Sequence, residues 1–328
     1  MFLLAADNLI GLNNYLQNNS WLQRNETVFS ATKPGEGNMN CVLRIKTNVT
    51  SYIIKQSRDY VEKYPQISAP KERAKSEAAF YNCIKQYPFL LEHTPGLLRV
   101  DGENNILLIQ DLGTSNDYTF LYNGKQQLKE EDAHMLTSFL NELHGNVIKN
   151  FDPLLKNDAM KQLNHEHIFV YPFMENNGLD LNTITEGLVE ISLQYKTDNA
   201  LKEKAKLLGE KYLEEGDHLL HGDYYPGSWL HTNEGLKIID PEFCFYGCAE
   251  FDLAIMIAHC YLSEQPQDII ELIINSYKKN EEFNITLMHQ FAGIEIMRRL
   301  LGLAQLPLKC SLSVKKELLQ KSYEFIMQ

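Results

Sequence analysis

The sequence lacks a surplus of positive charge. It contains 31 lysine and arginine residues against 43 aspartate and glutamate residues, which gives a formal net charge of −12. Proteins that bind nucleic acid need a basic surface that neutralises phosphates. The composition therefore argues against a nucleic-acid partner and is compatible with a cationic substrate.

The sequence also lacks long apolar segments and paired cysteine motifs. No stretch reaches the roughly 18 apolar residues that mark a membrane-spanning helix. Residues 1–7 contain no basic residue of the kind that opens a signal peptide. The six cysteines form no Cys-x-x-Cys pair. We therefore expect no membrane association, reduced thiols and a cytoplasmic location.

The first third of the sequence has the pattern of a small antiparallel sheet. Strand signals cover residues 26–31, 41–45, 52–56, 97–100 and 106–110. The loop between the first two contains Gly35 and Gly37, and glycines let backbone amides approach a phosphate closely. Taken alone, such a loop is more often an ordinary hairpin.

A lysine and a glutamate that are candidates for an ion pair follow this loop. Lys55 lies near the end of the third predicted strand, and a predicted helix over residues 71–86 carries Glu77 on an otherwise apolar stripe. A carboxylate on an apolar face needs a partner, and Lys55 is the natural one. Kinases keep the lysine that holds the α- and β-phosphates on a strand at this point. The alternative is a plain edge lysine and a solvated glutamate.

From about residue 129 the pattern changes to long helices, predicted over residues 129–145, 201–213, 251–259 and 288–303. Strands first and helices later predict an α+β protein. We expect a two-lobe, protein-kinase-like fold with an antiparallel-sheet N-lobe in residues 1–112 and a mainly helical C-lobe in residues 113–328. Gln110 and Leu112 would then lie in the hinge, facing the adenine.

The stretch of residues 221–251 carries the strongest chemical signal. Asp223 is followed by Ser228, then by a predicted hairpin over residues 228–239, and then by Asp240 and Glu242. A hairpin brings its two ends together, so these four side chains should lie close to one another. Phosphoryl transfer needs a group that orients the attacking hydroxyl and oxygen ligands that hold magnesium. The alternative is a surface hairpin with solvated acids. We expect Asp252 to brace this catalytic loop.

Adjacent arginines near the end of the chain form the last candidate. Arg298 and Arg299 lie among Ile294, Ile296, Met297, Leu300 and Leu301, so their helix should be largely buried. Buried guanidinium groups require anionic or polar partners. A phosphoryl group in transfer or the hydroxyls of a sugar would serve, whereas a cationic acceptor would favour acidic residues instead.

With both halves considered, the sequence resembles the aminoglycoside phosphotransferase and choline kinase superfamily, and within it the methylthioribose kinases. The resemblance spans most of the chain and rests on four groups of residues: the loop Gly-Glu-Gly-Asn-Met-Asn at 35–40, Lys55 with Glu77, His-Gly-Asp at 221–223 with Ser228 and Asp-Pro-Glu-Phe at 240–243, and the paired arginines 298–299. Tyr224 and Tyr225 depart from it, since the family usually has Leu-His there.

The resemblance implies ATP and Mg²⁺ as cofactors. It implies Asp223 as the base, Arg298 and Arg299 at the acceptor, and metal ligands at Ser228, Asp240 and Glu242. Nucleotide-binding positions would be Gly35, Gly37, Asn38, Asn40, Lys55, Glu77, Gln110 and Leu112.

The acceptor implied by the resemblance is O1 of 5-methylthioribose, in methionine salvage. Two alternatives stay open: a phosphotransferase for another small alcohol, sugar or aminoglycoside, and an inactive nucleotide-binding protein. A homodimer is also open.

Overall fold

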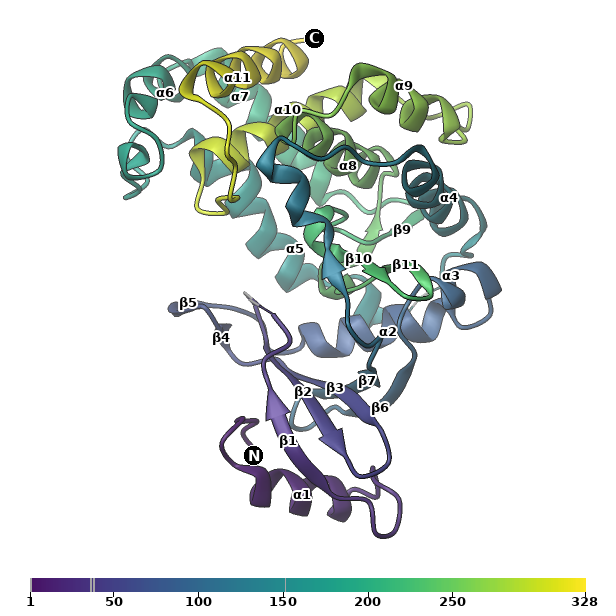
Figure 1. Ribbon diagram of the computed structural model, residues 1–328. Coiled ribbons are helices and arrows are strands. Elements are labelled where there is room, and N and C mark those ends of the chain that lie inside the picture. The colour runs from purple at the N-terminus through teal and green to yellow at the C-terminus, as the bar shows by residue number, and fades with distance from the viewer. Residues whose placement is uncertain (1, 36, 38, 151) are drawn as a thin grey trace.

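The structure is a computed structural model that describes residues 2–35, 37, 39–150 and 152–328. Its N-terminal part is a five-stranded antiparallel sheet with the strand order β1-β2-β3-β7-β6 (Figure 1). The strands are β1 Val28–Thr32, β2 Cys41–Thr47, β3 Ser51–Gln56, β6 Leu97–Asp101 and β7 Ile106–Gln110.

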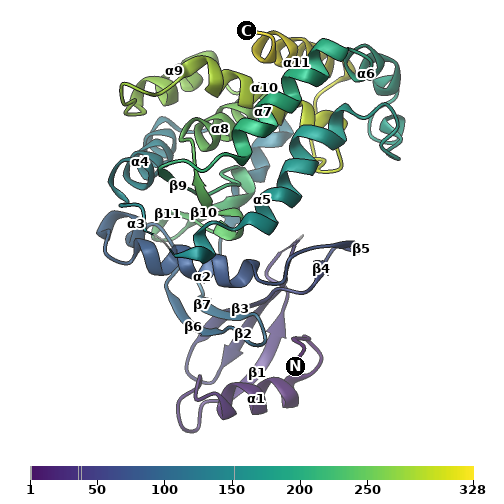
Figure 2. The same ribbon diagram turned by 180° about the vertical axis from the view of Figure 1, so that it is seen from behind.

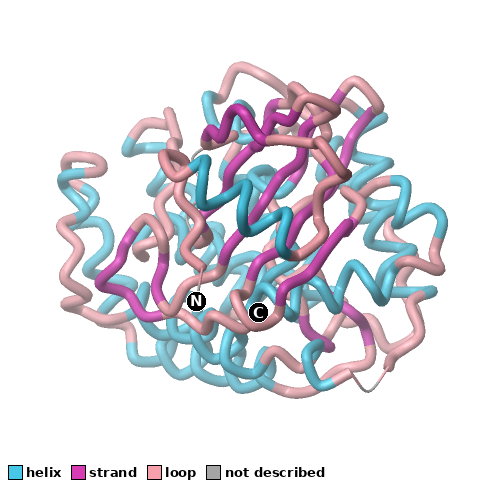
Figure 3. Tube along the Cα trace, turned by 90° about the horizontal axis from the view of Figure 1, so that it is seen from below, coloured by secondary structure: helices cyan, strands magenta, loops and turns pink. Residues whose placement is uncertain are grey.

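Two helices cover opposite faces of this sheet. Helix α1 (Leu9–Asn18) lies across the strands, as Figure 3 shows from below, and its buried side chains pack with Ile106 and Leu108 of β7. Helix α2 (Arg73–Ile84) packs against Leu107 and Ile109 of the same strand. Successive residues of a strand point to opposite faces, so the two helices enclose the sheet.

The remainder of the chain is mainly helical and lies beyond α2 (Figures 1 and 2). Its helices are α3 Pro88–Glu92, α4 Glu130–Asn146, α5 Asp158–His165, α6 Leu188–Lys196, α7 Asn199–Leu213, α8 Glu250–Leu262, α9 Gln267–Ser276, α10 Ile285–Leu301 and α11 Leu312–Ile326. Among the described residues, none of the helices combines the length and the apolar character needed to cross a bilayer.

Helix α10 is held between α8 and α11. All but four residues at its start are buried. Gly293 allows α11 to approach closely, because a Cβ atom at this position would lie only 2.7 Å from the Ser322 carbonyl oxygen. The Ser322 hydroxyl donates a hydrogen bond of 2.6 Å to the Gly293 carbonyl oxygen. The helix that carries the paired arginines is therefore fixed from both sides.

Short strands organise the segment between α7 and α8. Strands β10 (Trp229–Thr232) and β11 (Gly235–Ile238) form the predicted hairpin, with Trp229 opposite Ile238. Strand β8 (Asn116–Asp117) pairs with β10, and β9 (His218–Leu220) pairs with β12 (Phe245–Gly247). These pairings bring the chain before β10 next to the chain after β11.

The predicted α+β fold, with its antiparallel N-terminal sheet and helical remainder, is confirmed. The hairpin β4–β5 (Tyr60–Val61 and Tyr64–Ser68) was not predicted, because its strands are short and mostly exposed. Helices α3, α5, α6, α9 and α11 were not predicted either. The lobe boundary at residue 112 stays a prediction.

Candidate active site

Two neighbouring cavities lie between the sheet and the helical part. The first has a volume of about 220 Å³, and its lining includes Gly35, Gly37, Gln110, Leu112 and Asp240. The second has a volume of about 550 Å³, and its lining includes Lys55, Asp223, Ser228, Asp240 and Glu242. Gly37, Gly227 and Asp240 line both. Most of the predicted nucleotide and metal positions thus surround one continuous cleft.

The predicted pair of Lys55 and Glu77 is present and buried. The Lys55 ammonium lies 2.8 Å from Glu77 Oε1 and 2.5 Å from Asp240 Oδ1. Burial lowers the pKa of Lys55, but the charges of Asp240 and Glu77 outweigh it and raise that pKa well above its usual value. Lys55 is therefore a permanent cation on the wall of the second cavity, in contact with Asp240, which lines both cavities.

Glu242 is held by the N-terminal part of the protein. Its Oε2 atom accepts a hydrogen bond of 3.0 Å from Asn40 Nδ2 and lies 3.2 Å from Arg73 Nε. Arg73 is fully buried and also donates to Asn40 Oδ1 and to the Met39 carbonyl oxygen. The side chain of Asn40 is therefore engaged between a carboxylate and a guanidinium, a role that the sequence did not indicate.

The loop that carries Asp223 is stabilised by hydrogen bonds to a buried aspartate. Asp252, at the start of α8, accepts hydrogen bonds from the backbone amides of His221 at 2.6 Å and Gly222 at 2.9 Å. This arrangement confirms the bracing role predicted for Asp252. Gly222 has a φ of 83°, and a Cβ atom there would lie 2.1 Å from the Phe243 carbonyl oxygen. Only glycine fits this turn.

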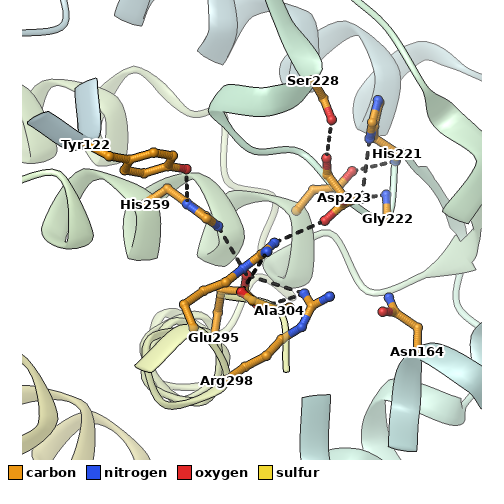
Figure 4. Close-up of polar contacts among 12 residues, drawn as sticks. Tyr122, Asn164, His221, Gly222, Asp223, Ser228, His259, Glu295, Arg298 and Ala304 are labelled. Carbon is orange, nitrogen blue, oxygen red and sulfur yellow. Dashed lines mark hydrogen bonds and ion pairs between the residues drawn. The ribbon is translucent and has the colours of Figure 1, made fainter. Parts of the chain in front are cut away.

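Asp223 is partly exposed to the second cavity, with 21% of its side-chain surface accessible. Arg299 Nη2 lies 3.5 Å from its Oδ1 atom. The Ser228 hydroxyl donates a hydrogen bond of 2.9 Å to the Asp223 backbone carbonyl oxygen (Figure 4). Burial raises the pKa of the Asp223 carboxyl above its usual value, and the charges of Arg299 and Arg298 oppose that rise. A raised pKa makes a carboxylate a better proton acceptor.

The paired arginines meet a third residue that the sequence analysis missed. Glu295 is fully buried and lies 3.0 Å from Arg298 Nη1 and 2.5 Å from Arg299 Nε. It precedes the arginines by three and four positions, the spacing that brings side chains together on a helix. That spacing was the available signal. Both guanidinium groups are buried, and neither lines the two cavities.

The two tyrosines that replace the family's Leu-His have different surroundings. Tyr224 is fully buried, and its hydroxyl donates a hydrogen bond of 2.9 Å to the Leu136 carbonyl oxygen. Tyr224 therefore belongs to the core. Tyr225 lines the second cavity, and the Arg299 guanidinium carbon lies 4.9 Å from its ring centroid. Its ring touches Gly227, where a Cβ atom would lie 2.4 Å from the Tyr225 hydroxyl.

One predicted nucleotide position, Asn38, lies outside the described residues. The metal positions Ser228, Asp240 and Glu242 surround the second cavity, and their hydroxyl and carboxylate oxygens suit magnesium. Among the described residues, no three His, Cys, Asp or Glu side chains form a cluster that could hold a metal ion. The magnesium site stays a prediction.

Curated relatives of the chain are methylthioribose kinases. The enzyme from Exiguobacterium sibiricum is 29% identical over 295 residues, which cover 82% of this chain and 70% of the relative. The enzyme from a Geobacillus strain is 24% identical over 353 residues, which cover 90% of this chain and 83% of the relative.

Solved structures share the fold. The choline kinase LicA from Streptococcus pneumoniae matches with a TM-score of 0.53 and 15% identity, covering 96% of this chain and 97% of that one. A spectinomycin phosphotransferase in complex with ADP and spectinomycin matches with a TM-score of 0.55 and 13% identity, covering 99% and 98%. These likenesses confirm the predicted kinase-like architecture.

A family model described as the phosphotransferase enzyme family matches residues 42–286. The predicted phosphotransferase activity is thereby confirmed. The matched region includes all of β2 except Cys41, strand β3, helix α2 and the whole segment from His221 to Asp252. Because it covers well over half of the residues, the chain belongs to the phosphotransferase enzyme family.

Proposed function

We propose that this protein transfers the γ-phosphoryl group of ATP to O1 of 5-methylthioribose. The observation that carries the kinase chemistry is the position of Asp223 in the same cleft as Lys55 and Asp240, beside the cavity lined by the glycine loop. The names of the curated relatives support methylthioribose as the acceptor.

The smaller cavity suits the nucleotide. Gly35 and Gly37 place backbone close to where phosphates would lie. Gln110, the last residue of β7, and Leu112, shortly after it, line the same cavity. Lys55, fixed by Glu77, supplies a permanent positive charge for the α- and β-phosphates. Magnesium would be held by Asp240 with Ser228 and Glu242, and when bound it would neutralise charge on the phosphates.

Asp223 is the proposed base. Its carboxylate faces the larger cavity, and its raised pKa favours acceptance of the proton from the attacking hydroxyl. Arg299 lies beside it and stabilises negative charge at the same point.

The charges of the larger cavity favour a neutral sugar over a cationic aminoglycoside. Three of the acids that line it are paired with cations: Asp223 with Arg299, Asp240 with Lys55 and Glu242 with Arg73. Lys63 lines the same cavity. Apart from Asp117, a polyamine would therefore meet acids that already have a cationic partner.

A cytoplasmic setting is part of the proposal. All six cysteines are free thiols, which is usual for proteins of reducing compartments.

An acceptor panel tests the function. The purified protein is incubated with Mg-ATP and methylthioribose, choline, ethanolamine, kanamycin or spectinomycin, and ADP release is coupled to a spectrophotometric assay. We expect turnover of methylthioribose and none of kanamycin. Turnover of another acceptor but not of methylthioribose would refute the proposed substrate, while the proposed kinase activity would stand. ATP binding without turnover of any acceptor would support the inactive nucleotide-binding alternative.

A further inference from the structure

Glu295 lies at the centre of a buried polar network next to the proposed base (Figure 4). Its carboxylate contacts Arg298 at 3.0 Å, Arg299 at 2.5 Å and His259 Nε2 at 3.1 Å. Although burial raises the pKa of Glu295, the charges of Arg298 and Arg299 hold it well below its usual value. Glu295 is therefore an anion with three donors around it.

A histidine and a tyrosine fix the far side of this carboxylate. Because ionised Glu295 can only accept hydrogen bonds, His259 Nε2 must carry the proton that it donates. His259 Nδ1 then accepts from the Tyr122 hydroxyl at 2.6 Å. Burial lowers the pKa of His259 to about 4, so the ring is neutral and adds no charge to the network. The neutral His259 ring therefore fixes the Glu295 carboxylate by a hydrogen bond, while the charge of Glu295 remains paired with the two arginines.

Arg299 is restrained on several sides. Its Nε atom is bound to Glu295, its guanidinium lies over the Tyr225 ring, and Nη1 contacts the Ala304 carbonyl oxygen at 3.4 Å. Only Nη2 is directed at Asp223, at 3.5 Å. An unrestrained arginine beside a carboxylate usually closes to about 2.7–2.9 Å and often binds through two nitrogens. The Arg299 guanidinium thus contacts two carboxylates, and its contact with Glu295 is the shorter of the two.

We propose that Glu295 is a positioning residue for the transfer reaction: it holds Arg299 close to Asp223 while preventing a tight, two-nitrogen pair with it. This inference rests on the proposed role of Asp223 as base. A carboxylate locked in a bidentate pair has its oxygens occupied and is a poorer acceptor for a substrate proton. With Glu295 in place, Asp223 keeps an arginine nearby and retains free oxygen surface toward the cleft.

A double-mutant cycle tests whether Glu295 acts through Arg299. Glu295→Gln keeps the side-chain volume and removes the charge. We expect kcat to fall about 10- to 100-fold, the size of loss that follows removal of a side chain that orients a metal ligand, with little change in the KM for ATP. In an Arg299→Gln background, Glu295→Gln should cause no further loss. An equal loss in both backgrounds, or a parallel rise in the KM for ATP, would overturn the proposal.

Glu250→Gln is the matched control. Glu250 is also a buried carboxylate, and it accepts a hydrogen bond of 2.7 Å from the Asn284 amide at the beginning of the same helix, α10. This variant should keep the kcat of the wild type. A loss as large as that of Glu295→Gln would indicate a general effect of buried charge and would contradict the positioning role.

An NMR measurement tests the restraint without any acceptor. The Nε–Hε resonance of Arg299 should be protected from exchange in the wild type and in Asp223→Asn, and lost in Glu295→Gln. If Glu295→Gln does not fold, the first two proteins still decide the matter, because loss of the resonance in Asp223→Asn would show that Asp223 holds the arginine. Failure of methylthioribose as substrate leaves this test intact, and the cycle is then run with the acceptor that the panel identifies.

Discussion

The Lys55 ammonium lies 2.5 Å from Asp240, closer than the 2.8 Å that separates it from its helix partner Glu77. The nucleotide lysine and the proposed metal acid are therefore directly linked. Asp240 has 47% of its side-chain surface exposed, whereas Glu77 has 1%. The contact with Asp240 is the one that solvent or a cation can replace, and the contact with Glu77 is structural.

Because Glu77 is buried and Asp240 is half exposed, replacement of Lys55 should affect stability mainly through Glu77. Lys55→Met should lower the free energy of unfolding by about 3–5 kcal/mol, because it leaves Glu77 buried without its partner. The double variant Lys55→Met, Glu77→Leu should recover much of that loss in urea denaturation. Neither variant should bind ATP as tightly as the wild type. Equal stability of the single and double variants would show that the buried pair is not the cause.

Asp223→Asn tests the base. The amide cannot accept the proton of the attacking hydroxyl, so kcat should fall roughly 10²–10⁴-fold while ATP affinity is retained. Asp217→Asn serves as control, since Asp217 is a largely exposed acid shortly before β9. Near wild-type turnover by Asp223→Asn would remove Asp223 from the mechanism.

Asp240→Asn tests the metal. Asp240 has a φ of 63°, in the left-handed region, which asparagine tolerates and alanine does not. The asparagine variant therefore removes the charge without straining the backbone. We expect loss of activity at ordinary magnesium concentrations and partial recovery at high magnesium. A magnesium dependence identical to that of the wild type would contradict the assignment.

His259 predicts a pH dependence of stability. Its pKa is about 6.5 in the unfolded chain and is lowered to about 4 in the folded protein. Between these values the unfolded chain binds the proton more readily, so stability is complete above pH 6.5 and falls as the pH drops toward 4. The full loss is on the order of 3 kcal/mol. Urea denaturation across this range should show the decline, and His259→Gln should have a shallower slope. Parallel curves would exclude His259 as the source.

The parts of the site that depend on local pattern could be predicted from the sequence. The hairpin β10–β11 has strand formers on both sides of a turn, and Glu77 was conspicuous as the one charge on an apolar stripe. Each of these signals lies within a short window. For the same reason the placement of Asp223 and Asp240 around one cavity followed from the size of the hairpin.

Contacts between distant segments could not be predicted in this way. Asn40 and Glu242 are 202 positions apart, and Tyr122 and His259 are 137 apart. No periodicity links such residues, because their meeting depends on how the helices pack. Glu295 is a different case, since its spacing from the arginines was visible in the sequence. The sequence already required partners for the buried arginines, but a phosphoryl group or a sugar was expected in that role, and the structure shows that Glu295 fills it.

The close packing at Gly293 has a consequence for how the gene for this protein can be altered. A stop codon placed after α10 would leave every proposed catalytic, nucleotide and metal residue in the translated chain. Such a product would nevertheless lack α11, the layer against which α10 is pressed at Gly293 and Ser322. Truncations of this kind should behave as loss-of-function alleles, although a survey of motifs alone would class them as intact enzymes.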